Sequence, residues 1–189
     1  MKITVKPITE SKRILDKCRL TVNKEPSKNS RPSTVFLDNI YMSEHSPIRE
    51  KLFDVYIEDI PYCISTHFVR HHQGIEKYVT TSRSDRTNIA DRSQRSQMDL
   101  VSMSMTVNSQ ALINMSKVRL CWCADKDARK VMFEIVRQVK ELEPELGSKL
   151  VPSCVYRGFC SEGNASCGYS REFLKNWRKE YLNGRKQIL

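Results

Sequence analysis

The segment from Asp125 to Leu142 constrains the fold of this chain more than any other part of the sequence. Its apolar residues recur at helical spacing and form one stripe, made of Val131, Ile135, Val139 and Leu142. Acidic residues in the first turn complement the helix macrodipole, and Pro144 and Gly147 end the pattern. The sequence therefore predicts a long amphipathic helix whose apolar face packs on other parts of the chain.

The other elements are predicted from the same periodicities. Alternation of apolar and polar residues predicts an edge strand over Ile3–Pro7 and a strand that begins at Leu52 and is interrupted at Asp59–Pro61. Helical spacing predicts three further helices, over Ser11–Arg19, Leu100–Val118 and Ser170–Leu189, the last of them basic with an aromatic face. Two polar stretches are predicted to be exposed, Lys24–Ser33 and Arg83–Gln97.

The size and charge of the chain limit its class. Its 189 residues suit one domain, or one domain with an appendage. The chain has 32 Lys and Arg against 22 Asp and Glu, a formal net charge of +10, which favours an anionic partner such as nucleic acid, nucleotide phosphate or an acidic surface. Since no apolar run is long enough to cross a bilayer and no signal-peptide hydrophobic region is seen, we expect a cytoplasmic protein without a membrane partner.

The seven cysteines are an odd number in a chain without an export signal, so thiols or a metal site are expected in place of disulfides. Three of them follow the pattern C-x5-C-x6-C, which differs from the C-x2-C spacing of most zinc sites: Cys154, Cys160 and Cys167. Two interpretations stay open. The three thiolates bind zinc together with Cys121, Cys123 or a histidine, or they are thiols of a metal-free loop. Cys121 to Cys123 is interpreted as core beside Arg119.

All four histidines lie between positions 45 and 72, and three of them flank Arg70: His67, His71 and His72. A run of hydroxyl and cationic residues, Thr80–Arg86, follows a few residues later. Guanidinium groups bind phosphate in a bidentate manner, and hydroxyls add short neutral donors. The pattern indicates a phosphate site without the glycine-rich loop of nucleoside triphosphatases, since no such motif is found.

Four ordered blocks of the sequence resemble the flavin-dependent thymidylate synthases. The stretch FVRHHQGIEKYVTTSR resembles the Arg-His-Arg signature of that family, and TVNSQALINMSKVRL resembles its Asn-Ala-Arg helix. Two upstream elements, Cys18–Thr21 and Glu44–Glu50, have counterparts in the same order. Together the blocks extend over about residues 18–142, so the chain resembles a divergent and compact member of the family.

The resemblance implies roles for particular residues. Eight of them would bind the flavin: Ser46, Arg70, His71, His72, Asn108, Ser109, Gln110 and Asn114. Arg119 would be catalytic, because a cation beside the pyrimidine ring favours the N3-deprotonated uracil and makes C5 more nucleophilic. Four further residues would bind the nucleotide phosphate: His67, Thr81, Ser82 and Arg83.

The resemblance also implies a reaction and an assembly. The enzyme would be an FAD-dependent methyltransferase that methylates dUMP to dTMP, with methylenetetrahydrofolate as carbon donor and NADPH as reductant. The fold would be α/β of the α+β type, with a mixed sheet and helices, and active sites would be shared within a homotetramer. Residues 1–150 would form the flavin- and nucleotide-binding catalytic domain. Residues 151–189 would form a cysteine-containing loop and a basic helix packed on it.

Departures from the family pattern leave alternatives open. His72 replaces the second arginine of the signature, and Gln110 replaces the arginine of Asn-Ala-Arg. A further phosphate-binding arginine would have to come from a later segment, at Arg86, Arg92 or Arg95. One alternative is methylation or hydroxymethylation of another pyrimidine nucleotide such as dCMP. Another is a non-enzymatic, basic nucleic-acid-binding protein with a cysteine-based zinc module, which the clustering of the histidines beside Arg70 disfavours.

Overall fold

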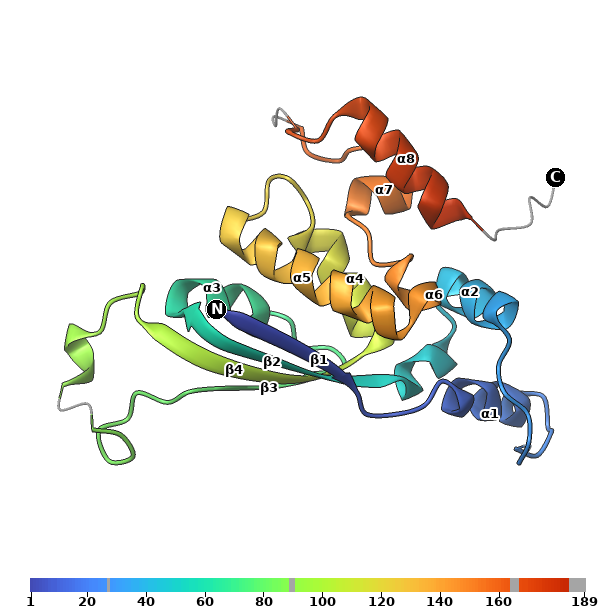
Figure 1. Cartoon of the computed structure of the whole chain (residues 1–189), viewed down its shortest axis with the longest axis horizontal. Helices are drawn as coiled ribbons and strands as arrows, with labels where there is room; N and C mark the ends of the chain where they lie inside the picture. The colour runs from blue at the N-terminus through green and yellow to red at the C-terminus, as the bar shows by residue number, and fades with distance from the viewer. Residues whose placement is uncertain (27, 89–90, 164–166, 184–189) are drawn as a thin grey trace.

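The computed structural model describes residues 1–26, 28–88, 91–163 and 167–183. Its centre is a sheet with strand order β1-β2-β4-β3, made of β1 (Lys2–Pro7), β2 (Leu52–Pro61), β3 (Ile75–Val79) and β4 (Leu100–Asn108). Helices α3 (Tyr62–Val69), α4 (Ser109–Arg119) and α5 (Lys126–Leu142) lie above one face of this sheet (Figure 1). The α+β class is confirmed. The prediction of a mixed sheet is wrong for the described strands, because all three strand pairings are antiparallel.

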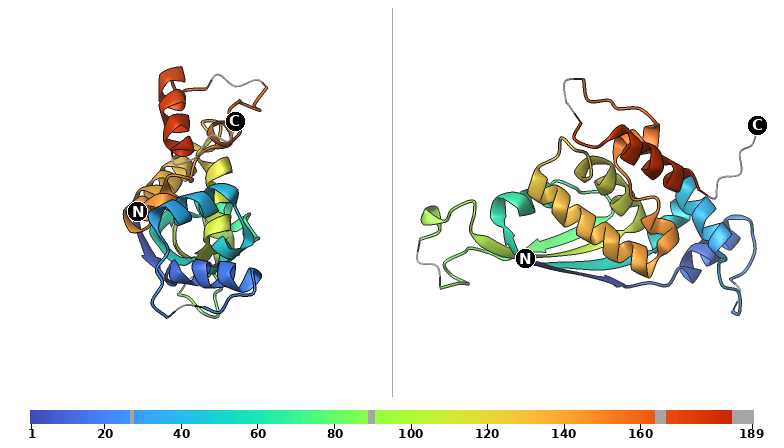
Figure 2. Two further views of the ribbon diagram at one scale, coloured as in Figure 1. Left: turned by 90° about the vertical axis from the view of Figure 1, so that its right-hand side faces the viewer. Right: turned by 45° about the horizontal axis from the view of Figure 1, so that its top comes forward.

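Shorter elements complete the chain at the two ends of the sheet. Near the carboxyl end of β1 lie α1 (Lys12–Thr21), α2 (Thr34–Ser43) and the 3-10 turn η1 (Ser46–Glu50) (Figure 1). A second 3-10 turn, η2 (Arg92–Gln94), lies in the long connection between β3 and β4, which projects beyond the opposite end of the sheet in both Figure 1 and the right-hand view of Figure 2. In the described residues no helix is long and apolar enough to cross a membrane.

The strand β4 corrects the helix expected over Leu100–Val118. Its side chains alternate between the core and the open face, and the four core residues are Val101, Met103, Met105 and Val107. This period of two is a strand pattern, and the helix starts only at Ser109. The prediction failed because methionine and hydroxyl residues mask the alternation, and because the real helix α4 follows without a loop.

The predicted interruption at Asp59–Pro61 is a bulge within one continuous strand. The pairing of β2 with β4 shifts register between Ile57 and Ile60, and Asp59 takes a left-handed conformation with φ of 55°. A bulge adds twist and bends the strand. As a result β2 runs directly into α3, the helix that carries His67.

The helix α5 confirms the prediction for Asp125–Leu142. Asp125 caps it by accepting hydrogen bonds from the backbone N–H groups of Asp127 and Ala128. Three of the four predicted stripe residues are fully buried, whereas Leu142 is partly exposed at the carboxyl end. On the same helix, Gln138 binds the edge strand through the N–H of Val5 and the carbonyl of Ile3.

The C-terminal part forms a further layer outside α4 and α5 (Figure 1). It contains α7 (Ser153–Arg157) and α8 (Arg171–Leu182), whereas α6 (Pro144–Gly147) packs beside α2 and α5 and places Leu146 in the main core. The part of the predicted helix beyond residue 183 lies outside the described residues. Trp177 packs against the main core, while Val151, Val155 and Tyr181 form a small second cluster. The division into residues 1–150 and 151–189 remains a prediction, which this change of cluster at residue 151 supports.

A buried ion pair lies where α1, α2, β2 and α5 meet. The Nζ of Lys51 is 3.0 Å from a carboxylate oxygen of Glu143, and both side chains are more than nine-tenths buried. Glu143 also accepts hydrogen bonds from the hydroxyls of Ser11 and Tyr41. The carbonyl of Lys51 accepts the backbone N–H of Ser109, so this network fixes the start of α4.

Candidate functional site

Two helix ends bring basic side chains together. The last turn of α3 and the residues after it supply His67, Arg70 and His71, and the last turn of α4 supplies Arg119. Arg119 Nε donates a hydrogen bond to Nε2 of His71 at 3.1 Å. Its Nη1 lies 3.3 Å from Nδ1 of His67. The structure thus unites residues that the sequence predicted separately for flavin, pyrimidine and phosphate.

The electrostatics of this cluster keep His71 neutral. Burial, followed by the positive charge of Arg119 and then that of Lys77, lowers the pKa of His71 to about 4. A neutral ring can accept the Arg119 hydrogen at Nε2 only when its own proton is on Nδ1. The contact therefore fixes both the charge and the tautomer of His71.

Arg119 is a half-buried cation, and within the described residues it has no anionic partner. Burial lowers its pKa, and the nearby charge of Arg70 lowers it further. Among the described residues, neither Arg119 nor Arg70 forms an ion pair with a carboxylate. Unpaired, partly desolvated cations are costly unless a ligand supplies the negative charge. The cluster is consequently suited to an anion.

Lys77 belongs to this cluster but was not predicted. It donates from Nζ to the backbone carbonyl of His71, and the same nitrogen lies 3.4 Å from Nδ1 of His72. The tight turn at Gly74, with φ of 71°, folds β3 back along the preceding residues. A glycine followed by an alternating pattern signals such a turn, and this signal could have pointed to Lys77.

The predicted flavin residues at the start of α4 are held by structural hydrogen bonds. Asn108 caps the helix by accepting the N–H of Ala111 at 2.9 Å, and its own N–H donates to the carbonyl of Gly74. Ser109 is fully buried against the carbonyl of Lys51. Both side chains therefore position α4.

A second polar group forms on another face of α4. Gln110 donates to Glu44 and lies 3.4 Å from the side-chain oxygen of Asn114, and Lys117 pairs with the same Glu44 at 2.8 Å. Ser46, two residues after Glu44, is exposed. Residues 110, 114 and 117 share one face of α4, and residue 119 lies on another face. Within the described residues, no hydrogen bond therefore joins Gln110, Asn114 or Lys117 to Arg119. Glu44 lies in a block noted in the sequence, but its role was missed.

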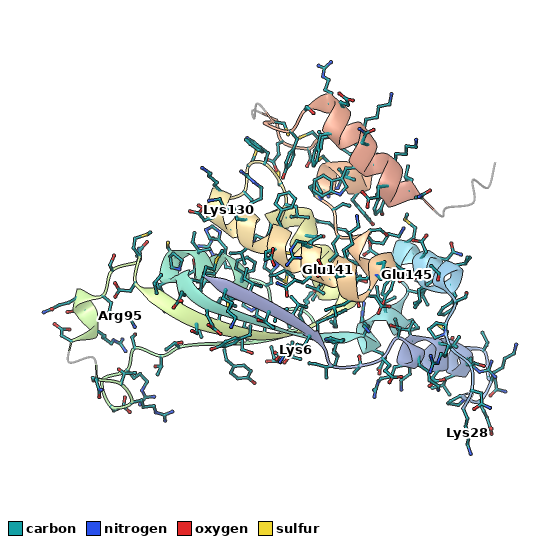
Figure 3. The ribbon with its side chains drawn as sticks, in the orientation of Figure 1. Lys6, Lys28, Arg95, Lys130, Glu141 and Glu145 are labelled. Carbon is teal, nitrogen blue, oxygen red and sulfur yellow. The ribbon has the colours of Figure 1, made fainter. Side chains whose placement is uncertain are left out.

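The predicted phosphate residues divide between three environments, since His67 lies beside Arg119 and the other three lie after β3. Arg83 is occupied by a bidentate ion pair with Asp85, at 2.9 and 2.8 Å, and the Thr81 hydroxyl accepts the backbone N–H of Arg83. Ser82 instead lines a cavity of about 410 Å³, whose other lining residues are Tyr62, Thr80, Arg92, Arg95, Ser96, Gln97 and Val101. Two of the three arginines considered from the sequence therefore line a polar cavity in the projecting connection, where Figure 3 labels Arg95.

The cysteines predicted as metal ligands gather at a different place. Cys154, Cys160 and Cys167 line one cavity together with Cys121 and Cys123. Within the described part of the chain, no three histidine, cysteine or acidic side chains lie close enough together to hold a metal ion as they stand. The interpretation of Cys121 to Cys123 as core is wrong, because these residues form an exposed loop between two helices, in which even the Trp122 ring is 40% exposed.

Comparison with solved structures gives the fold. The crystal structure of a UMP/dUMP methylase, PolB, from Streptomyces cacaoi bound with 5-Br dUMP superposes with a TM-score of 0.59 at 11% sequence identity, covering 84% of this chain and 96% of that one. The same methylase bound with 5-Br UMP gives 0.54 at 12% identity, with 78% and 93% covered. The chain therefore has the fold of a pyrimidine-nucleotide methylase.

Comparison of sequences gives the relationship. A flavin-dependent thymidylate synthase from Clostridium tetani (strain Massachusetts / E88) is 37% identical over 70 residues, which are 37% of this chain and 28% of that protein. The match thus spans well under two thirds of the relative. No family model matches the chain. The sequence match confirms the resemblance to flavin-dependent thymidylate synthases over these 70 residues, and the solved structures show the fold.

Proposed function

We propose that this protein is an FAD-dependent methyltransferase that converts dUMP to dTMP. The proposal rests on Arg119, a half-buried cation that has no carboxylate partner within the described residues and that is hydrogen-bonded to the neutral ring of His71. The relationship to a flavin-dependent thymidylate synthase and the shared fold with a UMP/dUMP methylase both support it.

Arg119 would act on the pyrimidine ring. A uracil that has lost its N3 proton carries negative charge over N3 and its carbonyl oxygens, and a guanidinium beside it stabilises that charge. The ring is then more nucleophilic at C5, the atom that accepts the one-carbon unit. His71 and His67 would orient the guanidinium, because Nε donates to Nε2 of His71 and Nη1 lies 3.3 Å from Nδ1 of His67, and the remaining N–H groups would face the ligand.

The flavin would bind beside the same cluster. FAD is anionic, and Arg70, His72 and Lys77 supply exposed or half-buried donors next to His71. These hydrogen-bond donors suit the anionic phosphates of FAD. Bound reduced flavin supplies the hydride of the reaction, and methylenetetrahydrofolate supplies the carbon. Since Gln110 and Asn114 lie on a different face of α4 from Arg119, the flavin contacts that the resemblance implies for them remain a prediction.

The phosphate would bind in the cavity of the β3–β4 connection. Arg92 makes no ion pair within the described residues, and Arg95 pairs with Asp99 at 3.0 Å at one side of the cavity. Ser82 adds a hydroxyl donor, whereas the Thr80 hydroxyl already donates to the carbonyl of Ser102 at 3.1 Å. Because this connection projects away from the helices, we propose that it completes the site of another subunit in a homotetramer (Figure 2).

The reaction is tested with the purified chain, FAD, NADPH, methylenetetrahydrofolate and dUMP, with nucleotide products identified by mass spectrometry. Formation of dTMP supports the proposal, and parallel reactions with dCMP and UMP identify the preferred base. A product heavier than the methylated nucleotide by one oxygen atom would replace methylation by hydroxymethylation. No product from any of the three nucleotides, in a chain shown to bind flavin, would contradict the proposed activity.

Sharing of the site between subunits is tested by complementation. Arg119→Ala subunits and Arg92→Ala/Arg95→Ala subunits are each expected to be inactive alone. When the two are co-expressed, sites that combine the intact half of each subunit regain activity. If one chain contributed all three arginines to each site, every site would carry a defect, and mixing would restore nothing.

A further inference from the structure

Five of the seven cysteines line one cavity of about 210 Å³. Cys121 and Cys123 come from the loop after α4, Cys154 from α7, and Cys160 and Cys167 from the segment that joins α7 to α8. All five are free thiols. The proposed methyl transfer uses none of them, so this convergence of three separate segments calls for another explanation.

Two glycines allow the segment after α7 to return to this cavity. Gly158 has φ of 88°, and a Cβ on it would lie 3.0 Å from the guanidinium of Arg178. The left-handed turn redirects the chain just before Cys160. A Cβ on Gly168 would lie 2.0 Å from the ring of Trp122, so the ring packs directly on the backbone next to Cys167. Neither position accepts a larger residue without rearrangement.

Aromatic contacts fix the walls of the cavity. The hydroxyl of Tyr169 donates to the carbonyl of Leu120 at 2.8 Å, and its ring meets Trp122 edge to face with 5.2 Å between centroids. The guanidinium of Arg129 lies over the Trp122 ring, 4.4 Å from its centroid. Segment 167–169 is therefore held against the loop that carries Cys121.

The charged residues around the cavity favour bound thiolates. Lys117 and Arg157 line it, against one carboxylate, Glu162. Lys117 is also paired with Glu44, whereas Arg157 has no ion pair within the described residues. A divalent metal with four thiolates carries a net charge of two minus, which nearby cations stabilise.

We propose that this cavity is a structural zinc site with Cys121, Cys154, Cys160 and Cys167 as its four ligands. Zinc in structural sites takes four tetrahedral ligands, and each thiol releases its proton to solvent when it binds. Cys121 and Cys154 are half-buried and Cys160 and Cys167 are exposed, and all four line the cavity. The loop after α4 carries two cysteines, but only one more ligand is needed for a set of four. We assign Cys121, because it is half-buried whereas Cys123 is exposed.

Among the described residues, the five cysteine thiols do not lie in an arrangement that holds a metal ion as they stand. Rotation about χ1 moves a cysteine sulfur between staggered positions, so a metal can draw the four thiols into tetrahedral geometry. Within the described residues, the second hydrophobic cluster has three buried members, Val151, Val155 and Tyr181, with partly buried side chains packed around them, which is a small core for this part of the chain. A metal would therefore supply the stabilisation that apolar burial does not.

The site is tested by titrating the reduced full-length chain with Co²⁺, a spectroscopic probe for zinc sites. We expect one Co²⁺ per chain, with intense sulfur-to-metal charge-transfer bands and the ligand-field bands of a tetrahedral thiolate site, and loss of these bands when Zn²⁺ is added. Cys154→Ser and Cys160→Ser should each abolish or alter the bands. Cys123→Ser and the distant Cys63→Ser are the matched controls and should keep them.

Absence of tetrahedral thiolate bands in the wild-type chain would overturn the proposal. So would an unchanged spectrum in both Cys154→Ser and Cys160→Ser. Bands lost in Cys123→Ser and kept in Cys121→Ser would overturn the assigned ligand set. Circular dichroism of each variant shows that it is folded, and Cys160→Ser, on an exposed segment, is the variant least dependent on the core. Since no flavin or nucleotide is present, the outcome is independent of the proposed enzymatic activity.

Discussion

Arg119 and His71 are 48 positions apart in the chain, yet the guanidinium Nε of one donates to the imidazole Nε2 of the other at 3.1 Å. The contact joins the end of α4 to the residues that follow α3. It requires a neutral His71, and the lowered pKa of that ring meets this requirement at neutral pH. The pair is therefore a preorganised donor group for an anionic ligand.

Replacing Arg119 by Ala should lower the rate of methyl transfer by about 10²–10³-fold, the usual loss when a group that stabilises developing charge is removed. The flavin should still bind, because Arg70, His72 and Lys77 remain. Turnover in single-turnover assays and flavin content after gel filtration measure the two effects separately. The matched control is Arg137→Ala, an exposed arginine of α5 that pairs with Glu134 and Glu141. Equal activity in the two variants would remove Arg119 from the mechanism.

His71 should make the protein less stable in acid. Its pKa is near 6.5 in the unfolded chain and about 4 in the folded one, so the unfolded state takes up the proton first as the pH falls. The stability due to the neutral ring is complete above pH 6.5 and is lost between pH 6.5 and 4. Each pKa unit corresponds to about 1.4 kcal/mol, and solvent screening of a half-buried ring reduces the total to about 1–2 kcal/mol.

Urea unfolding of the wild-type chain and His71→Gln at several pH values measures this difference. The stability advantage of the wild type over the variant should shrink as the pH falls through this window. A difference that is constant with pH would mean that His71 titrates normally in the folded protein.

Gly74 should tolerate no side chain. Its φ of 71° disfavours other residues, and a Cβ would lie 2.4 Å from the side-chain nitrogen of Asn108, the cap of α4. Strain and loss of the cap should together cost about 2–3 kcal/mol in Gly74→Ala. Chemical denaturation measures the cost. In Gly163→Ala the added Cβ has no neighbour within 4 Å, so that variant should be near neutral; similar losses in both would rule out the Asn108 contact as the cause.

The buried pair of Lys51 and Glu143 should be essential for stability. Glu143→Gln keeps the shape but leaves the Lys51 ammonium buried without its counter-charge, which costs about 3 kcal/mol or more. Thermal unfolding measures the change. Glu141→Gln, an exposed residue of the same helix end, should change stability by no more than about 0.5 kcal/mol. If the two substitutions had equal effects, the buried pair would not be the source of stability.

The sequence predicted those features that depend on local periodicity. The stripe of α5 was visible because four apolar residues repeat over an uninterrupted helix. The β4–α4 junction was missed because the strand passes into the helix without a turn residue. In addition, methionine, which occupies positions 103 and 105, is a common residue type in helices.

The candidate site was predictable in part. Motif resemblance pointed to His71 and Arg119 individually, but their contact depends on how α3 and α4 are placed over the sheet. Lys77 and Glu44 were missed because each acts through partners brought close by tertiary structure. The occupation of Arg83 by Asp85 is local, yet only the geometry of the loop shows that its guanidinium is already paired.

Binding of dUMP by Arg119 next to the flavin is tested most directly by titrating the FAD-loaded chain with dUMP. The absorption band of the flavin is monitored in the wild type and in Arg119→Ala. We expect a saturable change of the band in the wild type and a much weaker response in the variant, at equal flavin content. A chain that binds no flavin, or a variant that responds to dUMP as the wild type does, would contradict it.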